Sequence, residues 1–334
     1  MAETLTTTTT TTLTYAKAIN AALARALEEF PETLLYGEDL ALPGGVFGVT
    51  KGLRDRFGER VFDTPISETA MLGAAVGAAI MGRRPIVEIM WVDFSLVAFD
   101  QIVNQAANVR YVSGGRLTAP MTIRTQQGVL PGSCAQHSQS LEALFAHVPG
   151  LRVAMPADPQ QAYTLLLAAI ACDDPAIVIE HRAFYHTMSG EVALGGPVEP
   201  VGGARVLREG GSVTIVALGA MVQSALDAAD ELAADGIEAD VIDPRWIAPL
   251  DTAMILASVA RTGRLVIAHQ ANVTGGIGAE IAARVAGDGI WHLDAPIERV
   301  GLPDMRMPAA PVLQAALVPG AADIVAAARR AVQA

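Results

Sequence analysis

Residues 152–181 read RVAMPADPQQAYTLLLAAIACDDPAIVIEH, and this stretch decides the fold class. Two short runs rich in β-branched residues, Arg152–Met155 and Ala176–His181, predict strands. Between them, Asp158–Ala171 has the length and the small apolar residues that are typical of a helix. A strand, a helix and a second strand in this order predict a parallel pair joined by a helical crossover. The stretch therefore indicates an α/β protein.

The same alternation extends along the chain in both directions. Upstream, strands are expected at Pro85–Met90 and Met121–Thr125, and helices near Tyr15–Glu29, Glu68–Met81, Ser95–Tyr111 and Ser138–His147. Downstream, strands are expected at Val213–Leu218, Ala239–Ile242 and Leu265–Ala268, and helices near Met221–Ala234, Asp251–Ala260 and Ile277–Ala286.

Three boundaries follow from composition. A Gly/Pro-rich stretch at 189–205 predicts a linker, and the threonine run near the start predicts a disordered tail over residues 1–13. We expect two doubly wound domains, at 14–188 and 206–334. Ligands bind at the carboxyl ends of strands in such sheets, so the loops that follow strands are the places to search for a site.

Composition also excludes several classes of protein. A net charge of −12 argues against nucleic acid, whose phosphates require a basic surface. No apolar run approaches the roughly 20 residues of a membrane span. The two cysteines, Cys134 and Cys172, are too few for a disulfide framework, which indicates a reducing, cytoplasmic location.

Three local patterns could carry chemistry. In Asp63-Thr-Pro-Ile-Ser-Glu68 the serine is a suitable N-cap and Glu68 falls in the first helical turn, so spacing alone favours a capping acid. His137 lies in a polar loop before a helix; a lone histidine there is usually structural, and its hydrogen-bonding neighbours raise the odds of a site without deciding between the two. Phe94, just beyond a strand, could flank a flat ring, although a core position is the simpler interpretation.

Other motifs fail on inspection. Gly287-Asp-Gly289 resembles the start of the motif that holds the metal of thiamine diphosphate, but no asparagine follows Asn272 to complete it. No Cys/His cluster has zinc spacing, and neither a P-loop nor a nucleophile elbow is present.

Many short strings, taken in order, resemble one family from about Tyr15 to the C-terminus. They include Asp63–Glu68 and the strings Gly44-Gly-Val-Phe-Gly-Val-Thr-Lys-Gly52, Arg84-Pro-Ile-Val-Glu-Ile-Met90, Arg110-Tyr-Val-Ser-Gly-Gly115, Gln136-His-Ser-Gln-Ser-Leu-Glu142 and Thr274-Gly-Gly-Ile-Gly-Ala-Glu280. They look like the β subunits of the decarboxylase components of pyruvate, branched-chain 2-oxo acid and acetoin dehydrogenase complexes.

The resemblance implies a fold and partners. It implies a pyrimidine-binding domain followed by a transketolase-like C-terminal domain, in a heterotetramer of two α and two β subunits. Thiamine diphosphate would lie between an α and a β chain, with magnesium held mainly by the α subunit. The acyl group would pass to lipoamide on a lipoyl-bearing acyltransferase core.

It also implies roles for single residues. Glu68 would hydrogen-bond the aminopyrimidine ring nitrogen and exchange a proton with it, which a glutamine could not do. Ile66 (through its backbone), Met90 and Phe94 would form the rest of the pyrimidine pocket. His137 would face the thiazolium side and orient the oxo acid or assist acyl transfer.

A structural potassium ion is a further implication, bound largely by carbonyl groups at matching positions. These positions are Met121, Ala169, Ile170, Cys172 and Asp174.

Some positions depart from the family pattern. Thr125-Gln-Gln127-Gly replaces a proline-containing turn, and His269-Gln270 replaces a commoner pair. These departures leave the substrate open among pyruvate, branched-chain oxo acids and acetoin, and the sequence does not identify the acyltransferase. Two other functions stay open: a split transketolase-like carbon-unit transferase, and a non-catalytic assembly subunit.

Overall fold

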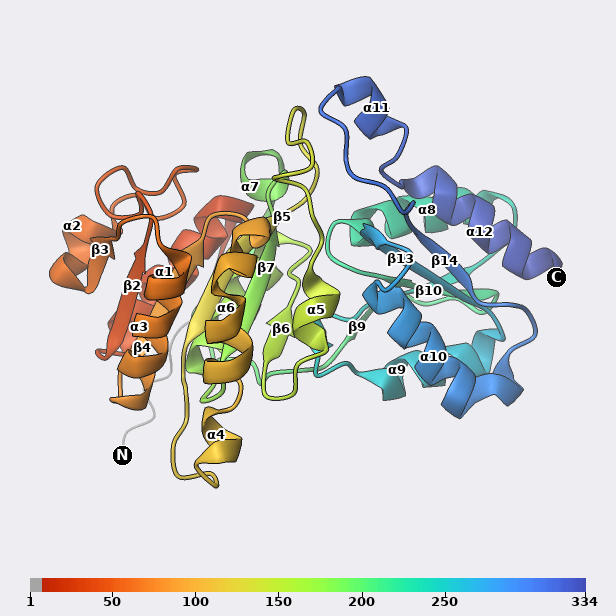
Figure 1. The fold of residues 1–334 in the computed structure, drawn as a ribbon. Coiled ribbons are helices and arrows are strands. Elements are labelled where there is room, and N and C mark those ends of the chain that lie inside the picture. Colours follow the sequence, from red (N-terminus) through yellow and green to blue (C-terminus); the bar gives the residue numbers. More distant parts are fainter. Residues whose placement is uncertain (1–7) are drawn as a thin grey trace. The chain divides into compact units, whose positions relative to one another are not determined.

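The structure is a computed structural model that describes residues 8–334, and it divides into two compact units (Figure 1). The first contains the chain up to Gln127 together with His147–Val201, and the second contains Gly128–Ala146 and Gly202–Ala334. The change of unit after Val201 falls inside the linker expected at 189–205. The composition of residues 128–146 does not predict that they belong to the second unit.

A parallel sheet forms the centre of the first unit. Its strands lie in the order β6-β7-β5-β4-β2-β3. Their bounds are β2 Thr33–Gly37, β3 Val61–Asp63, β4 Arg84–Ile89, β5 Thr122–Gln127, β6 Arg152–Ala154 and β7 Ala176–His181. Strand β7 and most of β4 and β5 are buried along their length, as expected for strands covered by helices on both faces.

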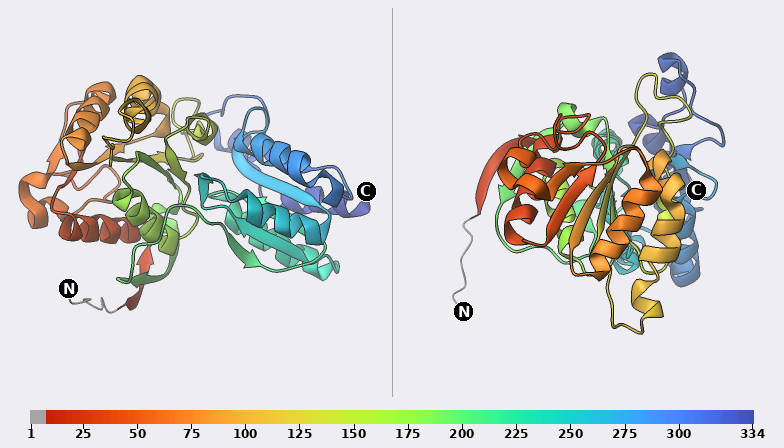
Figure 2. Two further views of the ribbon diagram at one scale, coloured as in Figure 1. Left: turned by 90° about the horizontal axis from the view of Figure 1, so that it is seen from below. Right: turned by 60° about the vertical axis from the view of Figure 1, so that its left-hand side comes forward.

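Helices cover both faces of this sheet (Figure 2). Helices α1 (Tyr15–Glu29) and α6 (Pro159–Ala171) pack against each other, whereas α3 (Glu68–Ile80) packs on β4 and on the short helices that follow it. The side chains of Thr14 and Asp158 cap the first turns of α1 and α6. The remaining short helices are α2 Leu53–Phe57, η1 Gly58–Arg60, α4 Val109–Val112 and α7 Phe184–Thr187.

The threonine run forms a strand, so the expectation of a disordered tail is wrong for Thr9–Leu13. Strand β1 (Thr9–Thr14) pairs antiparallel with β8 (Ser189–Leu194), which also makes the first part of the expected linker regular structure. Threonine is β-branched and suits an extended, half-exposed strand once a partner is present. That partner lies about 180 residues away in the sequence, and local composition could not reveal it. Residues 1–7 lie outside the described part of the chain.

Two expected helices are shorter than predicted. Ser95–Tyr111 is divided among η2 (Val92–Ala98), a π-helix η3 (Gln101–Ala106) and α4. The hydroxyl of Thr69 donates to the carbonyl of Val97 at 2.7 Å, near the junction between η2 and η3. Ser138–His147 contracts to α5 (Glu142–Ala146), because the hydroxyl of Ser138 turns back to the carbonyl of Cys134.

The second unit has a five-stranded sheet in the order β14-β13-β10-β11-β9, in which only β9 is antiparallel. Its strands are β9 Arg205–Arg208, β10 Val213–Ala217, β11 Ala239–Asp243, β13 Leu265–Asn272 and β14 Glu298–Leu302. Its helices are α8 Met221–Ala234, α9 Thr252–Thr262, α10 Ile277–Gly289, η4 Ile290–His292, α11 Pro311–Ala315 and α12 Ala321–Gln333, with β12 at Trp246–Ala248. The predicted fold class, α/β with two wound domains, is confirmed.

Candidate active site

Three neighbouring parallel strands of the first unit end at one edge of its sheet. Strand β2 pairs with both β3 and β4, so the loops that follow these three strands emerge together. They carry Glu38 and Asp39 after β2, Pro65–Ser67 after β3, and Met90–Phe94 after β4. The side chains expected to form a pyrimidine pocket therefore gather at the edge where α/β sheets bind ligands.

Glu68 is the first residue of α3, and its side chain is largely buried, with 8% of its surface exposed. Ser67 takes the N-cap position as expected, but its side chain makes no capping hydrogen bond. A negative charge at this end of a helix is favoured by the unpaired backbone N–H groups and the helix dipole. The capping role that spacing alone suggested for Ser67 is therefore absent, and Glu68 sits at an uncapped helix start.

The carboxyl group of Glu38 lies close enough to Glu68 for their like charges to interact. Burial, and then the negative charges of Glu68, Asp39 and Glu88, raise the pKa of Glu38 above its ordinary value. Like charges that share a partly desolvated site favour the protonated form of at least one of them. The edge can therefore hold and exchange protons at carboxyl oxygens, and Glu38 is a member that the sequence did not single out.

The remaining pocket candidates differ in exposure. The side chain of Ile66 is 80% exposed, whereas Met90 and Phe94 are half-buried. The backbone N–H of Phe94 donates to the carbonyl of Trp91 at 3.0 Å, which fixes the turn that follows β4. Phe94 is therefore not a fully buried core residue, and part of its ring stays available at the edge.

A buried ion-pair network that was not predicted from the sequence lies beneath this edge. Arg124 in β5 donates to Glu88 of β4 at 2.6 Å and to both carboxylate oxygens of Glu180 of β7 at 2.8 Å. The hydroxyl of Tyr185 also donates to Glu180. Burial raises the pKa of Glu180, and the guanidinium of Arg124 opposes that shift. The signal was available: charged residues inside strands buried on both faces must find partners.

The Gln126–Gln127 departure lies at the end of β5. There Gln126 and Gln127 pair in register with Glu180 and His181 of β7. The amide of Gln126 is buried, and neither its nitrogen nor its oxygen has a hydrogen-bond partner in the described part of the chain. The departure thus places an amide at the carboxyl end of a central strand.

His137 belongs to the second unit, in the loop between β5 and α5. It is half-buried, and the loop around it is fixed by Ser133, whose hydroxyl accepts the N–H of Leu130 at 3.1 Å. Cys134 in this loop has a φ of +48°, in the left-handed region. The catalytic role expected for His137 stays a prediction.

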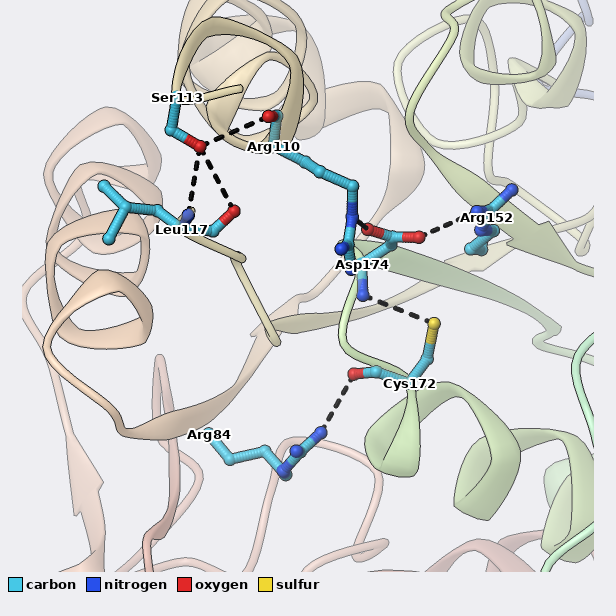
Figure 3. A network of polar contacts seen from close by, with 7 residues as sticks. All are labelled: Arg84, Arg110, Ser113, Leu117, Arg152, Cys172 and Asp174. Carbon is cyan, nitrogen blue, oxygen red and sulfur yellow. Dashed lines mark hydrogen bonds and ion pairs between the residues drawn. The ribbon is translucent and has the colours of Figure 1, made fainter. Parts of the chain in front are cut away.

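The five positions assigned to potassium lie in the first unit and are already engaged by the protein. Arg84 donates to the carbonyl of Ile170. Arg84 also donates to the carbonyl of Cys172, and Arg110 and Arg152 hold the carboxylate of Asp174 (Figure 3). Among residues 8–334, no group of three or more His, Cys, Asp and Glu side chains could hold a metal ion.

Comparison with known proteins divides the chain between residues 187 and 202. The family model described as "Transketolase, pyrimidine binding domain" matches residues 11–187, and "Transketolase, C-terminal domain" matches residues 202–324. Three dehydrogenase and oxidoreductase β subunits match almost the full length of the chain at 40–44% identity. The chain belongs to the transketolase-like dehydrogenase β subunits.

The relatives of this β subunit differ in their named substrates. The acetoin:2,6-dichlorophenolindophenol oxidoreductase subunit beta of Cupriavidus necator is 44% identical, with 94% of this chain and 95% of the relative covered. A mitochondrial pyruvate dehydrogenase E1 component subunit beta-2 of Oryza sativa is also 44% identical, with 96% and 86% covered. The 2-oxoisovalerate dehydrogenase subunit beta of Bacillus subtilis is 40% identical, with 90% and 93% covered.

A solved structure is also similar to this β subunit. It is described as a split gene transketolase in an inactive beta4 tetramer, and it is 27% identical with a TM-score of 0.78. The match covers 96% of this chain and 98% of that one. In the described part of the β subunit, no helix is both long enough and apolar enough to cross a membrane.

Proposed function

We propose that this β subunit supplies the pyrimidine half of the active site in a thiamine-diphosphate-dependent dehydrogenase that acts on a 2-oxo acid or on acetoin. One observation carries the proposal: Glu68 is buried at an uncapped helix start, among carboxyl groups, at the carboxyl edge of a parallel sheet. A buried carboxyl in acidic surroundings is suited to proton exchange with a ring nitrogen.

In this site the carboxyl of Glu68 would hold the proton and pass it to the pyrimidine side. When bound, the cofactor supplies the nucleophilic carbon of the reaction, and the protein supplies orientation and proton transfer. Phe94 and Met90 are half-buried at the same edge and would pack on the ring, while the backbone of Ile66 lies two residues before Glu68. Glu38 would share negative charge with Glu68 and so keep a proton available.

The site would be completed by an α subunit. As the family resemblance implies, magnesium and the diphosphate would be held mainly by that partner. Large apolar side chains are exposed in the loops and helices of the same edge: Leu42 is 87% exposed, Ile66 80% and Val97 63%. Exposed apolar groups of this size are typical of a surface that another chain covers.

The proposed substrates rest on the named relatives, and the proposed lipoyl acceptor rests on the family resemblance. Their names specify acetoin, pyruvate and 2-oxoisovalerate dehydrogenases or oxidoreductases. We propose transfer of the resulting acyl group to lipoamide on an acyltransferase core, with His137 assisting that transfer. A cytoplasmic location stays a prediction from the two cysteines.

A second candidate is a split transketolase. The similarity to a split gene transketolase structure favours it, but at 27% identity against 40–44% for the dehydrogenase subunits. The two functions differ in the acceptor, which would be a sugar phosphate for a transketolase and a lipoyl group for a dehydrogenase.

The test is reconstitution with a cognate α subunit. The pair is assayed with pyruvate, branched-chain oxo acids and acetoin, with a lipoyl domain as acceptor, and in parallel with a ketose and an aldose phosphate. Acylation of the lipoyl domain supports the dehydrogenase, and sugar-phosphate products without acylation would overturn it. Titration of the isolated β chain with the cofactor and magnesium is a second test: tight binding without the α subunit would contradict a shared site.

A further inference from the structure

The last turn of α6 and the loop that joins it to β7 contain four of the five positions that the family resemblance assigns to potassium. Arg84, the first residue of β4, reaches into this loop. Its Nη1 donates to the carbonyl of Ile170 at 2.6 Å and to the carbonyl of Cys172 at 2.9 Å, and its Nη2 donates to the carboxylate of Asp173 at 3.2 Å. Figure 3 shows the guanidinium pointing at the Cys172 carbonyl. A positive charge thus already lies between two of the expected ligands.

The guanidinium of Arg84 is held in place from several sides. Its side chain is 13% exposed, and its Nε lies 3.6 Å from a carboxylate oxygen of Glu32. The ring of Phe30 lies 5.4 Å from its Cζ, within the range of a cation–π contact. These contacts, together with the strand that carries it, orient the guanidinium toward the loop and not toward solvent.

The other expected ligands are also engaged. The carbonyl of Met121 accepts the N–H of Ala176 at 3.0 Å, and the carbonyl of Ala169 accepts the N–H of Cys172 at 3.3 Å. The N–H of Asp174 donates to the sulfur of Cys172 at 3.4 Å. The loop therefore closes on its own backbone groups.

The carboxylate of Asp174 is balanced by two further arginines. Arg110 Nε donates to one of its oxygens at 2.5 Å and Arg152 Nη2 to the other at 2.7 Å. Burial works to raise the pKa of Asp174, but hydrogen bonds from Arg110 and Arg152 outweigh it, so the pKa is lowered. Around the loop, three guanidinium groups face three carboxylates: Arg84 with Glu32 and Asp173, and Arg110 and Arg152 with Asp174.

We propose that Arg84 is the resident cation of this loop and that the β subunit requires no potassium ion there. Guanidinium is always charged and presents several donors in a plane, so it can satisfy two carbonyls at once. A potassium ion on the same carbonyls would lie close to this guanidinium and would be repelled by it. The cluster is also neutral without a metal, so a further cation would leave an excess positive charge.

The test measures thermal unfolding of the full-length chain in potassium, sodium and choline chloride at equal ionic strength. The native chain is expected to unfold at the same temperature in all three, within about 1 °C. Arg84→Met keeps the apolar stem and leaves the carbonyls of Ile170 and Cys172 without a cation. In choline chloride this variant is expected to unfold at a lower temperature than the native chain. In potassium chloride its unfolding temperature is expected to rise again by about 5 °C, which restores part of the loss.

Arg83→Met is the matched control. The side chain of Arg83 is exposed, so the unfolding temperature of this variant should not depend on the cation. A thallium soak of native crystals locates any potassium site by anomalous scattering. A thallium peak on the carbonyls of Ile170 and Cys172, or a potassium-dependent rise for the native chain, would overturn the proposal. If Arg84→Met does not fold, these two measurements on the native chain decide. Neither requires an α subunit or a substrate, so failure here is distinct from failure of the proposed reaction.

Discussion

Arg124 and Glu180 form a bidentate ion pair in the interior of the first unit, with both N–O distances at 2.8 Å and both side chains about 1% exposed. The pair joins β5 to β7, and Glu88 joins β4 to the same guanidinium. Paired charges of this depth are tolerated because each partner compensates the other. The network lies under the edge that carries Glu68, and we expect it to fix the ends of β4, β5 and β7.

Arg124→Met should therefore lower the free energy of unfolding of the chain by about 3–5 kcal/mol, because Glu88 and Glu180 would stay buried without a cation. Urea unfolding followed by circular dichroism measures the change. Arg56→Met is the control: it removes an exposed pair with Glu28 and should cost less than about 1 kcal/mol. Equal losses in the two variants would show that the buried network is not special.

Glu68→Gln should lower kcat of the reconstituted α–β pair by at least about 100-fold, because an amide can bond a ring nitrogen but cannot exchange its proton. Cofactor affinity, measured by calorimetry, should change far less than kcat. Glu59→Gln, at an exposed carboxylate, is the control and should keep full activity. Unchanged turnover of Glu68→Gln would instead favour an assembly role for the chain.

His269 should make the second unit sensitive to acid. Burial lowers its pKa from 6.5 to about 4, while its hydrogen bond with the carbonyl of Ala271 works in the opposite direction. Because His269 binds the proton more readily in the unfolded chain, protonation favours unfolding. The folded state is therefore most stable above about pH 6.5, and this stability is lost as the pH falls toward 4. The free energy of unfolding should drop by up to about 1.4 kcal/mol per pH unit, or about 3 kcal/mol over this window.

Urea unfolding between pH 7 and pH 4 measures this dependence. His269→Gln removes the ionisable group and should reduce the slope between pH 6.5 and 4. His292→Gln, at an exposed histidine of the same unit, should leave the slope as it is in the native chain. A native slope that His269→Gln does not change would assign the acid sensitivity to other groups.

Two glycines of α10 provide a matched pair: Gly278 packs against His269, and Gly287 does not. A Cβ at Gly278 would lie 2.5 Å from His269 Nε2, so Gly278→Ala should destabilise the chain by about 1–3 kcal/mol. A Cβ at Gly287 would meet nothing within 4 Å, so Gly287→Ala should stabilise the chain by up to about 1 kcal/mol through helix propensity. Thermal unfolding of both variants tests this; destabilisation by Gly287→Ala would contradict the helical geometry there.

Much of the fold could be predicted because regular hydrophobic patterns are local. The helix at Tyr15–Glu29 and the strand at Ala176–His181 agree with the structure to the residue, since each has caps or turns at its ends and apolar residues between them. The short strand β3 and the strand β14 were missed, because three to five residues carry little periodicity. The strand at Thr9–Thr14 was missed because its partner is distant in the chain.

By itself the sequence determined the alternation of strands and helices, the family and the candidate pocket residues, because these depend on residues close together in the chain or on ordered motifs. Only the tertiary structure decided which charged groups lie together: Arg124 with Glu88 and Glu180, Arg84 with the carbonyls of Ile170 and Cys172, and the like charges of Glu38 and Glu68. The physical reason is that the partners of a buried charge come from neighbouring strands and loops tens of residues apart. Local sequence shows that a charge needs a partner, and the order of the strands selects which one it finds.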